Sequence, residues 1–183
     1  MGASITYGSG GEGNGWANQV ASKFGWQLAN LAKGSSGYTI PKIDSGNCKA
    51  RINFESQLNC GLQFAPDVVV ISGGLSDCKN LPSITQSVQD KVLKTIQTAK
   101  TLFPEALVIT TPVITFAETA CLSELNQSIQ TAADSTSSYF VTGAQNWLLP
   151  YPTWSNDAVH PNALGHAFVA KSFIEWMSSQ NLN

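Results

Sequence analysis

Short apolar runs separated by longer amphipathic segments dominate the pattern of hydrophobic and polar positions along this chain. Three such runs are bounded by residues that break regular structure: 67–72 (DVVVIS), 106–110 (ALVIT) and 139–141 (YFV). Runs that are apolar throughout over this length are typical of parallel strands buried on both faces. The pattern therefore predicts three strands of a parallel sheet. Residues 27–31 (QLANL) predict a further short strand nearer the start of the chain.

Helical periodicity fills the segments between these strands. In residues 83–103 the apolar positions recur at spacings of three and four: Val88, Val92, Ile96, Ala99 and Phe103. This spacing predicts an amphipathic helix, which we expect to be capped by Ser83 and ended by Pro104. Four more helices are predicted over residues 16–24, 50–64, 122–133 and 162–177.

Strands that alternate with helices predict an α/β fold with right-handed crossovers. We expect a three-layer α/β/α sandwich around a mostly parallel, flavodoxin-like sheet. The 183 residues contain no internal repeat, low-complexity tract or linker. We therefore expect residues 1–183 to form a single domain.

Charge excludes some classes of partner. Only 12% of the residues are charged, the formal net charge is -2, and no dense run of Lys or Arg is present. Nothing in this pattern would neutralise a phosphate backbone, so we expect no nucleic-acid partner. No stretch approaches the ~20 apolar residues that a membrane-spanning helix needs, so we expect no membrane span. We expect a monomer.

The four cysteines are Cys48, Cys60, Cys78 and Cys121. They lack the tight spacing of a zinc site, so two disulfides are the favoured interpretation, and four reduced thiols are the alternative. Of the three possible pairings we favour Cys48 with Cys60 and Cys78 with Cys121, because the last two each follow a predicted strand at the same end of the sheet. Disulfides favour an oxidising compartment, and we expect a secreted, extracellular protein.

Four short motifs carry residue types that acyl transfer requires, namely a nucleophile on a tight turn, a histidine, a carboxylate and donors for an oxyanion. They are residues 2–6 (GASIT), 34–37 (GSSG), 73–77 (GGLSD) and 157–161 (DAVHP). In order and spacing they resemble the four blocks of the GDSL/SGNH hydrolase family, across essentially the whole chain. Each motif is common by itself, so the resemblance depends on their order and on the strands that precede them.

The resemblance implies a role for each matching residue. Ser4 would be the nucleophile, His160 the general base and acid, and Asp157 the carboxylate that orients His160. Gly37 and Ser76 would line the oxyanion hole. The implied protein is a serine esterase that hydrolyses small acyl or acetyl esters of carbohydrates or lipids, with no cofactor and no metal. Its partner would be a small-molecule or polysaccharide ester substrate.

Three features depart from the family pattern. Position 3 is Ala where the family usually has Asp, and position 76 is Ser where the family has Asn. A hydroxyl is shorter than an amide, and losing one oxyanion donor can cost ~10² to 10³ in rate, so we expect reduced activity. Only Met1 precedes Gly2, where the family has a buried strand. We therefore expect the first strand to be absent. Either the start of the chain is cropped or misassigned, or the domain is decayed or rearranged.

Other interpretations stay open at this stage. The whole chain could be a catalytically weakened or inactive SGNH-fold module that binds a partner. Gly37 could serve only to allow a positive φ. His166 and Asp77 are expected to be structural. Three aromatic residues precede Asp157 and could contact a substrate or pack in the core: Trp147, Tyr151 and Trp154.

Overall fold

The structure is a computed structural model that describes residues 1–40, 48, 52–79 and 81–182. Within these residues the sheet has three parallel strands in the order β1 (Val68–Ile71), β2 (Leu107–Thr110) and β3 (Tyr139–Phe140). The register of β1 on β2 runs from Val68 opposite Leu107 to Ile71 opposite Thr110. The three apolar runs thus form the predicted parallel strands, and the α/β fold is confirmed.

Six α-helices surround this sheet in the described part of the chain: α1 (Ser4–Tyr7), α2 (Trp16–Phe24), α3 (Phe54–Gly61), α4 (Gln86–Leu102), α5 (Ala120–Ser135) and α6 (Ala163–Ser179). Short 3-10 helices join them: η1 (Leu62–Phe64), η2 (Leu75–Cys78), η3 (Ala144–Asn146) and η4 (Pro152–Trp154). The helix predicted over 50–64 begins at Phe54, because the side chain of Asn53 accepts a hydrogen bond from the Ser56 N–H and caps it. Residues 50 and 51 lie outside the described part.

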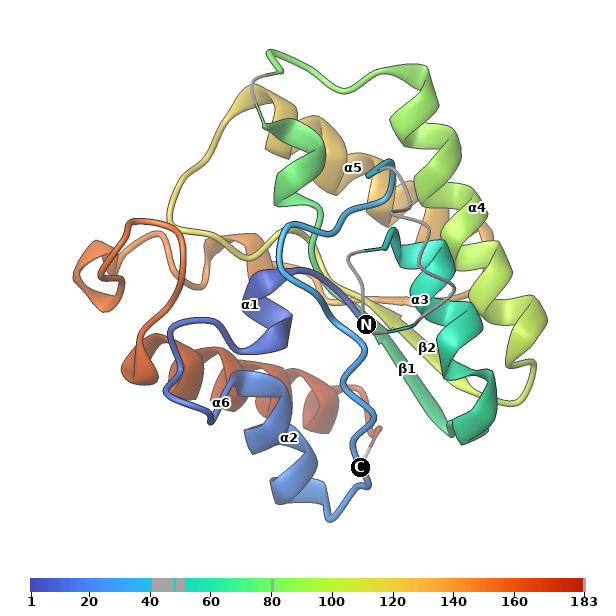
Figure 1. Ribbon diagram of the computed structural model, residues 1–183, viewed down its shortest axis with the longest axis horizontal. Helices are drawn as coiled ribbons and strands as arrows, with labels where there is room; N and C mark the ends of the chain where they lie inside the picture. Colours follow the sequence, from blue (N-terminus) through green and yellow to red (C-terminus); the bar gives the residue numbers. More distant parts are fainter. Residues whose placement is uncertain (41–47, 49–51, 80, 183) are drawn as a thin grey trace.

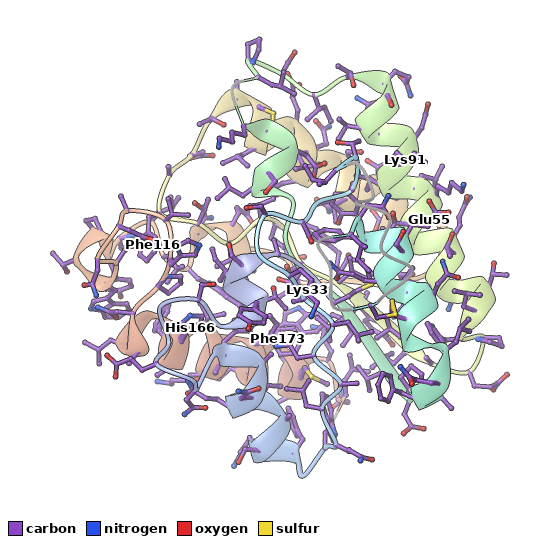
Figure 2. The ribbon with its side chains drawn as sticks, in the orientation of Figure 1. Lys33, Glu55, Lys91, Phe116, His166 and Phe173 are labelled. Carbon is purple, nitrogen blue, oxygen red and sulfur yellow. A yellow bond between two sulfur atoms is a disulfide. The ribbon has the colours of Figure 1, made fainter. Side chains whose placement is uncertain are left out.

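Helices α2 and α6 lie on one side of the sheet, and α3, α4 and α5 lie on the other (Figure 1). Alternate side chains of the strands belong to two apolar clusters, one on each face of the sheet. Val69 and Ile71 face the cluster formed with α3, α4 and α5. Val68 and Val70 face the cluster formed with α2 and α6, which includes Phe173 (Figure 2). The result is the predicted three-layer arrangement, with the carboxyl ends of all three strands at one edge.

The predicted cap of α4 is wrong. The helix begins at Gln86, after Thr85, and Ser83 lies outside it. The cause is a tertiary contact, because Ile84 is buried in the α3–α5 cluster and its N–H donates to Glu124 of α5 at 3.0 Å. This contact holds the chain before α4 in a non-helical path that local sequence does not reveal.

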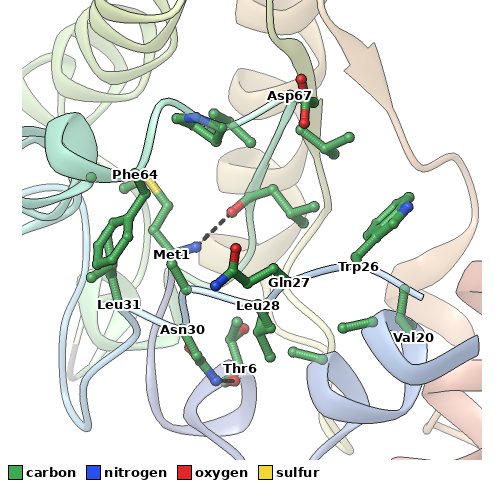
Figure 3. Close-up of a pocket in the computed structure, with 18 of the residues that line it drawn as sticks. Met1, Thr6, Val20, Trp26, Gln27, Leu28, Asn30, Leu31, Phe64 and Asp67 are labelled. Atoms are coloured by element: carbon green, nitrogen blue, oxygen red, sulfur yellow. Dashed lines mark hydrogen bonds between the residues drawn. The ribbon is translucent and has the colours of Figure 1, made fainter. Parts of the chain in front are cut away.

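The predicted strand over 27–31 is also wrong. This segment has no strand pairing, and the Asn30 side chain instead donates to Thr6 O at 2.9 Å. Between the segment and β1 lies a cavity of about 640 Å³ that is lined mainly by apolar side chains, among them Leu28 and Phe64 (Figure 3). On the side of β1 away from β2, the described part of the chain makes one isolated parallel bridge, between Gly2 and Ser72.

Both favoured disulfides are present, Cys48–Cys60 and Cys78–Cys121. The second joins η2 to the first turn of α5, so it ties together the segments that follow β1 and β2. Among the described residues, no helix is long and apolar enough to cross a membrane.

Candidate active site

Ser4 is the first residue of α1, at the carboxyl edge of the sheet. The Ser72 carbonyl at the end of β1 accepts hydrogen bonds from Ala3 N–H at 3.4 Å and from Thr6 Oγ1 at 2.9 Å. A side chain at Gly2 would overlap this same carbonyl, so only glycine allows the close approach. The end of β1 therefore fixes the turn that presents Ser4.

The side chain of Gln57, on α3, forms two hydrogen bonds with the backbone of this turn. Gly2 N–H donates to Gln57 Oε1 at 2.8 Å, and Gln57 Nε2 donates to Gly2 O at 3.1 Å. The buried side-chain amide thus pairs with Gly2 as the backbone of a neighbouring strand would. The role of Gln57 was not predicted, since a glutamine on an amphipathic helix carries no local signal of such a partner.

Asp157 and His160 lie on a loop closed by an antiparallel bridge between Ser155 and Pro161. Asp157 Oδ1 accepts hydrogen bonds from His160 N–H at 2.7 Å and from Val159 N–H at 2.9 Å. Ala158 adopts a φ of 62°, an uncommon conformation for alanine, and this allows the loop to turn back on its own carboxylate.

The structure brings Ser4, His160 and Asp157 together in one hydrogen-bonded series. His160 Nδ1 lies 2.6 Å from Asp157 Oδ2, and His160 Nε2 lies 3.0 Å from Ser4 Oγ. An ionised carboxylate only accepts, so Nδ1–H donates to Asp157 and Nε2 is left to accept from the Ser4 hydroxyl. The predicted residues are thus in contact although 156 positions separate Ser4 from His160.

The groups around the Asp157 carboxylate keep it ionised. The hydrogen bond from His160 N–H, followed by the His160 side chain and Val159 N–H, holds the pKa of Asp157 well below its usual range. The side chain is 53% exposed, so water also stabilises the charge. The carboxylate can therefore orient His160 and stabilise its protonated form.

Asp77 organises the other side of the site. Its buried carboxylate accepts hydrogen bonds from Tyr38 N–H at 2.9 Å and from the N–H and hydroxyl of Thr39 at 2.8 and 2.7 Å. Burial raises the pKa of Asp77, and these hydrogen bonds oppose the rise. As expected, Asp77 has a structural role, which is to join η2 to the loop that contains Gly37.

Gly37 and Ser76 flank this junction. A Cβ at Gly37 would overlap Asp77 Oδ2, while Ser76 immediately precedes Asp77 on η2. The φ of Gly37 is not positive, so the proposed need for a positive φ is wrong and close packing explains the glycine. Gly73, at the start of the same segment, packs against Ala3. The three predicted blocks around Ser4 therefore meet at one edge of the sheet.

A model of the GDSL-like lipase/acylhydrolase family matches residues 1–168. The chain belongs to this family. No curated protein gives a significant match. The GDSL-like family assignment therefore depends on the family model and on the site geometry that accompanies it.

Solved structures of this GDSL-like fold superpose over nearly the whole chain. The psychrotrophic esterase EstA from Pseudoalteromonas sp. is 14% identical, with a TM-score of 0.71 over 100% of this chain and 97% of its own. A putative GDSL-like lipase from Parabacteroides merdae is 19% identical, with a TM-score of 0.71 over 100% and 94%. A family two carbohydrate esterase from Clostridium thermocellum, in complex with cellohexaose, is 17% identical, with a TM-score of 0.73 over 100% and 64%. At these identities the likeness shows the fold.

The aromatic residues of this GDSL-like protein that precede Asp157 have two different environments. Tyr151 and Trp154 stack with ring centroids 3.9 Å apart, and Phe168 of α6 meets the Tyr151 ring edge-on. Both stacked rings are half-buried and lie on or next to η4, just ahead of the Asp157 loop. Trp147 packs against the cluster between the sheet and α6. Tyr151 and Trp154 therefore present partly exposed aromatic surface close in sequence to Asp157.

Proposed function

We propose that this protein is a serine ester hydrolase in which Ser4, His160 and Asp157 form the catalytic triad. The observation that carries the proposal is the pair of hydrogen bonds that joins the three side chains, at 3.0 and 2.6 Å. A nucleophile, a base and a group that orients the base, each within hydrogen-bond reach of the next, are the arrangement that acyl transfer requires.

In the acylation step, Ser4 Oγ attacks the ester carbonyl while His160 Nε2 takes the hydroxyl proton. The carbonyl oxygen becomes an oxyanion, and the protonated His160 is stabilised by Asp157. When the tetrahedral intermediate collapses, the C–O bond to the alcohol breaks and His160 gives its proton to the leaving oxygen. The acyl group then remains on Ser4 as an ester.

Deacylation repeats the sequence with water as the nucleophile. His160 takes a proton from the water, which attacks the acyl carbon, and then returns the proton to Ser4 Oγ as the acid departs. In both steps the backbone N–H groups of Ser4 and Gly37 and the hydroxyl of Ser76 are the proposed oxyanion donors. Because the Ser76 hydroxyl is short and free to rotate, we expect slower turnover than an amide donor would give.

The proposed substrates are small acyl or acetyl esters of carbohydrates or lipids. The stacked Tyr151 and Trp154 support this class, because flat aromatic surfaces can pack on a sugar ring or an acyl chain. The fold is shared with a carbohydrate esterase whose structure holds cellohexaose. The two disulfides are consistent with an extracellular protein, and we propose that the enzyme is secreted and acts as a monomer without a metal or cofactor.

Hydrolysis of p-nitrophenyl acetate and labelling by a fluorophosphonate test the proposal directly. We expect both in the wild-type protein and neither in Ser4→Ala, because the label bonds covalently to the activated hydroxyl. Ser87→Ala, which removes an exposed hydroxyl on α4, is the matched control and should keep both activities. Equal hydrolysis by wild type and Ser4→Ala would contradict the assignment of the nucleophile.

A second candidate is a GDSL-like binding module with little or no catalytic activity. Two observations favour it, namely Ala3 and Ser76 at positions where the family has Asp and Asn. Such a module would neither hydrolyse the ester nor react with the fluorophosphonate. It would still bind a glycan or protein, which binding assays on immobilised oligosaccharides would detect.

A further inference from the structure

His166 is a buried histidine that the proposed mechanism does not use. It lies on the first turns of α6, six residues after His160, and its side chain has no exposed surface. Figure 2 shows it between α6 and the glycine-rich loop that follows α1. Buried histidines need partners for both ring nitrogens, and those partners indicate what the side chain holds in place.

Both ring nitrogens of His166 bond to this loop. Nε2 lies 2.9 Å from Ser9 O, and since a carbonyl only accepts, Nε2 carries the hydrogen and donates. Nδ1 then accepts from Trp16 N–H at 3.2 Å. Only the neutral ring in this one tautomer satisfies both partners, and burial, the main influence, lowers the pKa of His166 and so favours that neutral form.

The loop that His166 holds contacts both sides of the Ser4–His160 pair. Ser9 N–H donates to Ser4 O at 3.0 Å, so Ser9 connects the His166 ring to the nucleophile turn. The next residue, Gly10, packs so closely on the segment of His160 and Pro161 that a Cβ would overlap Pro161 O. Gly11 covers the imidazole, because a Cβ there would lie 2.7 Å from His166 Cδ2.

We propose that His166 is a positioning residue that keeps Ser4 Oγ and His160 Nε2 within hydrogen-bond distance by fixing the Ser9–Trp16 loop between them. The inference rests on the proposed hydrolase function. Ser4 and His160 come from opposite ends of the chain, and the His166 ring joins α6 directly to the exit of α1. Releasing the loop would let the two sides move apart, and a misplacement of ~1 Å at a reacting group can cost ~10² in rate.

Three substitutions of His166 distinguish a role in positioning the Ser9–Trp16 loop from a role in filling the core. His166→Leu removes both hydrogen bonds at similar volume. His166→Gln places an amide N–H near the former Nε2 and can still donate to Ser9 O, whereas His166→Asn places an acceptor near the former Nδ1 and can still accept from Trp16 N–H. Because Ser9 is the residue bonded to Ser4, the Gln variant should restore more activity than the Asn variant.

The steady-state experiment uses p-nitrophenyl acetate at a temperature well below the melting point of every variant. We expect His166→Leu to lower kcat ~10-fold or more, with KM changed by less than about threefold, and His166→Gln to recover most of the loss. Val169→Ala, which removes buried volume on the same helix, is the control for lost stability alone and should leave kcat within about twofold. A His166→Leu protein that is folded and retains wild-type kcat would overturn the inference, as would an equal kcat loss in Val169→Ala.

Crystal structures of the wild type and His166→Leu give a readout that does not depend on turnover. We expect the distance from Ser4 Oγ to His160 Nε2 to exceed 3.5 Å in His166→Leu and to stay near 3.0 Å in His166→Gln. An unchanged distance in His166→Leu would refute the positioning role. If the wild type neither hydrolyses esters nor reacts with the fluorophosphonate, the proposed function fails, while the distance still decides what His166 does.

Discussion

The carboxylate of Asp157 is held by the backbone of the loop to which it belongs, at an exposed position. Its Oδ1 accepts two backbone N–H groups, which leaves Oδ2 for the imidazole of His160. One residue therefore fixes both the loop conformation and the orientation of the His160 ring, the proposed general base. Replacing the charge without changing the shape separates these two roles.

Asp157→Asn is expected to reduce kcat by roughly 10² to 10⁴, with KM changed by less than about threefold. An amide can present its NH₂ group to His160 Nδ1, which favours the tautomer that cannot accept the Ser4 proton. Steady-state kinetics with p-nitrophenyl acetate measures the effect, and circular dichroism checks that the fold is kept. A kcat within threefold of the wild type would show that Asp157 does not orient the base.

Ser76→Asn is expected to raise kcat ~10-fold or more, because an amide is longer and less free to rotate than a hydroxyl and one oxyanion donor is worth ~10² to 10³ in rate. Thr is the matched control, since Ser76→Thr keeps a hydroxyl and adds only a methyl group. The ratio of kcat between the two variants is the measurement. If Ser76→Asn were no faster than the wild type, Ser76 would not face the oxyanion.

The contact among Ser4, Asp157 and His160 was predictable from sequence because four blocks occur in a fixed order, with the first and the last near opposite ends of the chain. Gln57 and His166 were not predictable in their roles. The partner of Gln57 lies 55 residues away, and the partners of His166 lie 150 and 157 residues away. Such hydrogen bonds exist only after the chain has folded, so no local pattern indicates them.

Among whole elements, the predictions succeeded where the signals are local. Both bounds of helix α2 were predicted correctly, because glycines flank it at positions 15 and 25 as its N-cap and C-cap. The cap of α4 and the strand over 27–31 failed because each depends on a neighbour, namely Glu124 for the first and an adjacent strand for the second. A strand is a pairing between two segments, and one segment alone does not specify it.

The Cys78–Cys121 disulfide links η2, which carries Ser76 and Asp77, to α5. Cys78→Ser with Cys121→Ser is expected to lower the free energy of unfolding by ~2 to 4 kcal/mol, because the bridge closes a long loop in the unfolded chain. The double substitution should also lower kcat, because η2, which carries Ser76, would lose its covalent link to α5. Urea unfolding and kinetics measure the two effects, with Cys48→Ser and Cys60→Ser as the control pair. An equal kcat loss in the control pair would show that η2 is not the cause.

For the molecule as a whole, elements on both faces of the sheet contribute to the proposed active site at one edge of the sheet. The α2–α6 side supplies His160 and the loop held by His166, and the α3–α5 side supplies Gln57 and the bridge to α5. Relative movement of the two sides would therefore open the Ser4–His160 contact, so global stability and site geometry are coupled.

Lowering the pH should reduce the free energy of unfolding, because folded His166 resists protonation. Its pKa is lowered in the folded protein, whereas in the unfolded chain it lies near the ordinary ~6.5. Below that value the unfolded chain binds a proton that folded His166 does not, so stability falls as pH decreases from about 6.5 toward the folded pKa. Urea unfolding between pH 5 and 8 should show a larger decline in the wild type than in His166→Gln, which cannot titrate. Parallel curves would exclude His166 as the cause.

Within the described residues, strand β1 pairs with another strand on one side only, namely with β2, so its two rows of backbone amides should differ in how fast they exchange hydrogen. Leu107 N–H bonds to Asp67 O and Thr111 N–H to Ile71 O, so the odd-numbered residues of β1 face β2 and the amides of Val68 and Val70 face the cavity. Strand β2, by contrast, is flanked on both sides. Deuterium should therefore replace the amide hydrogens of Val68 and Val70 well before those of β2, and the last protected amides of the protein should mark β2 as its most persistent element.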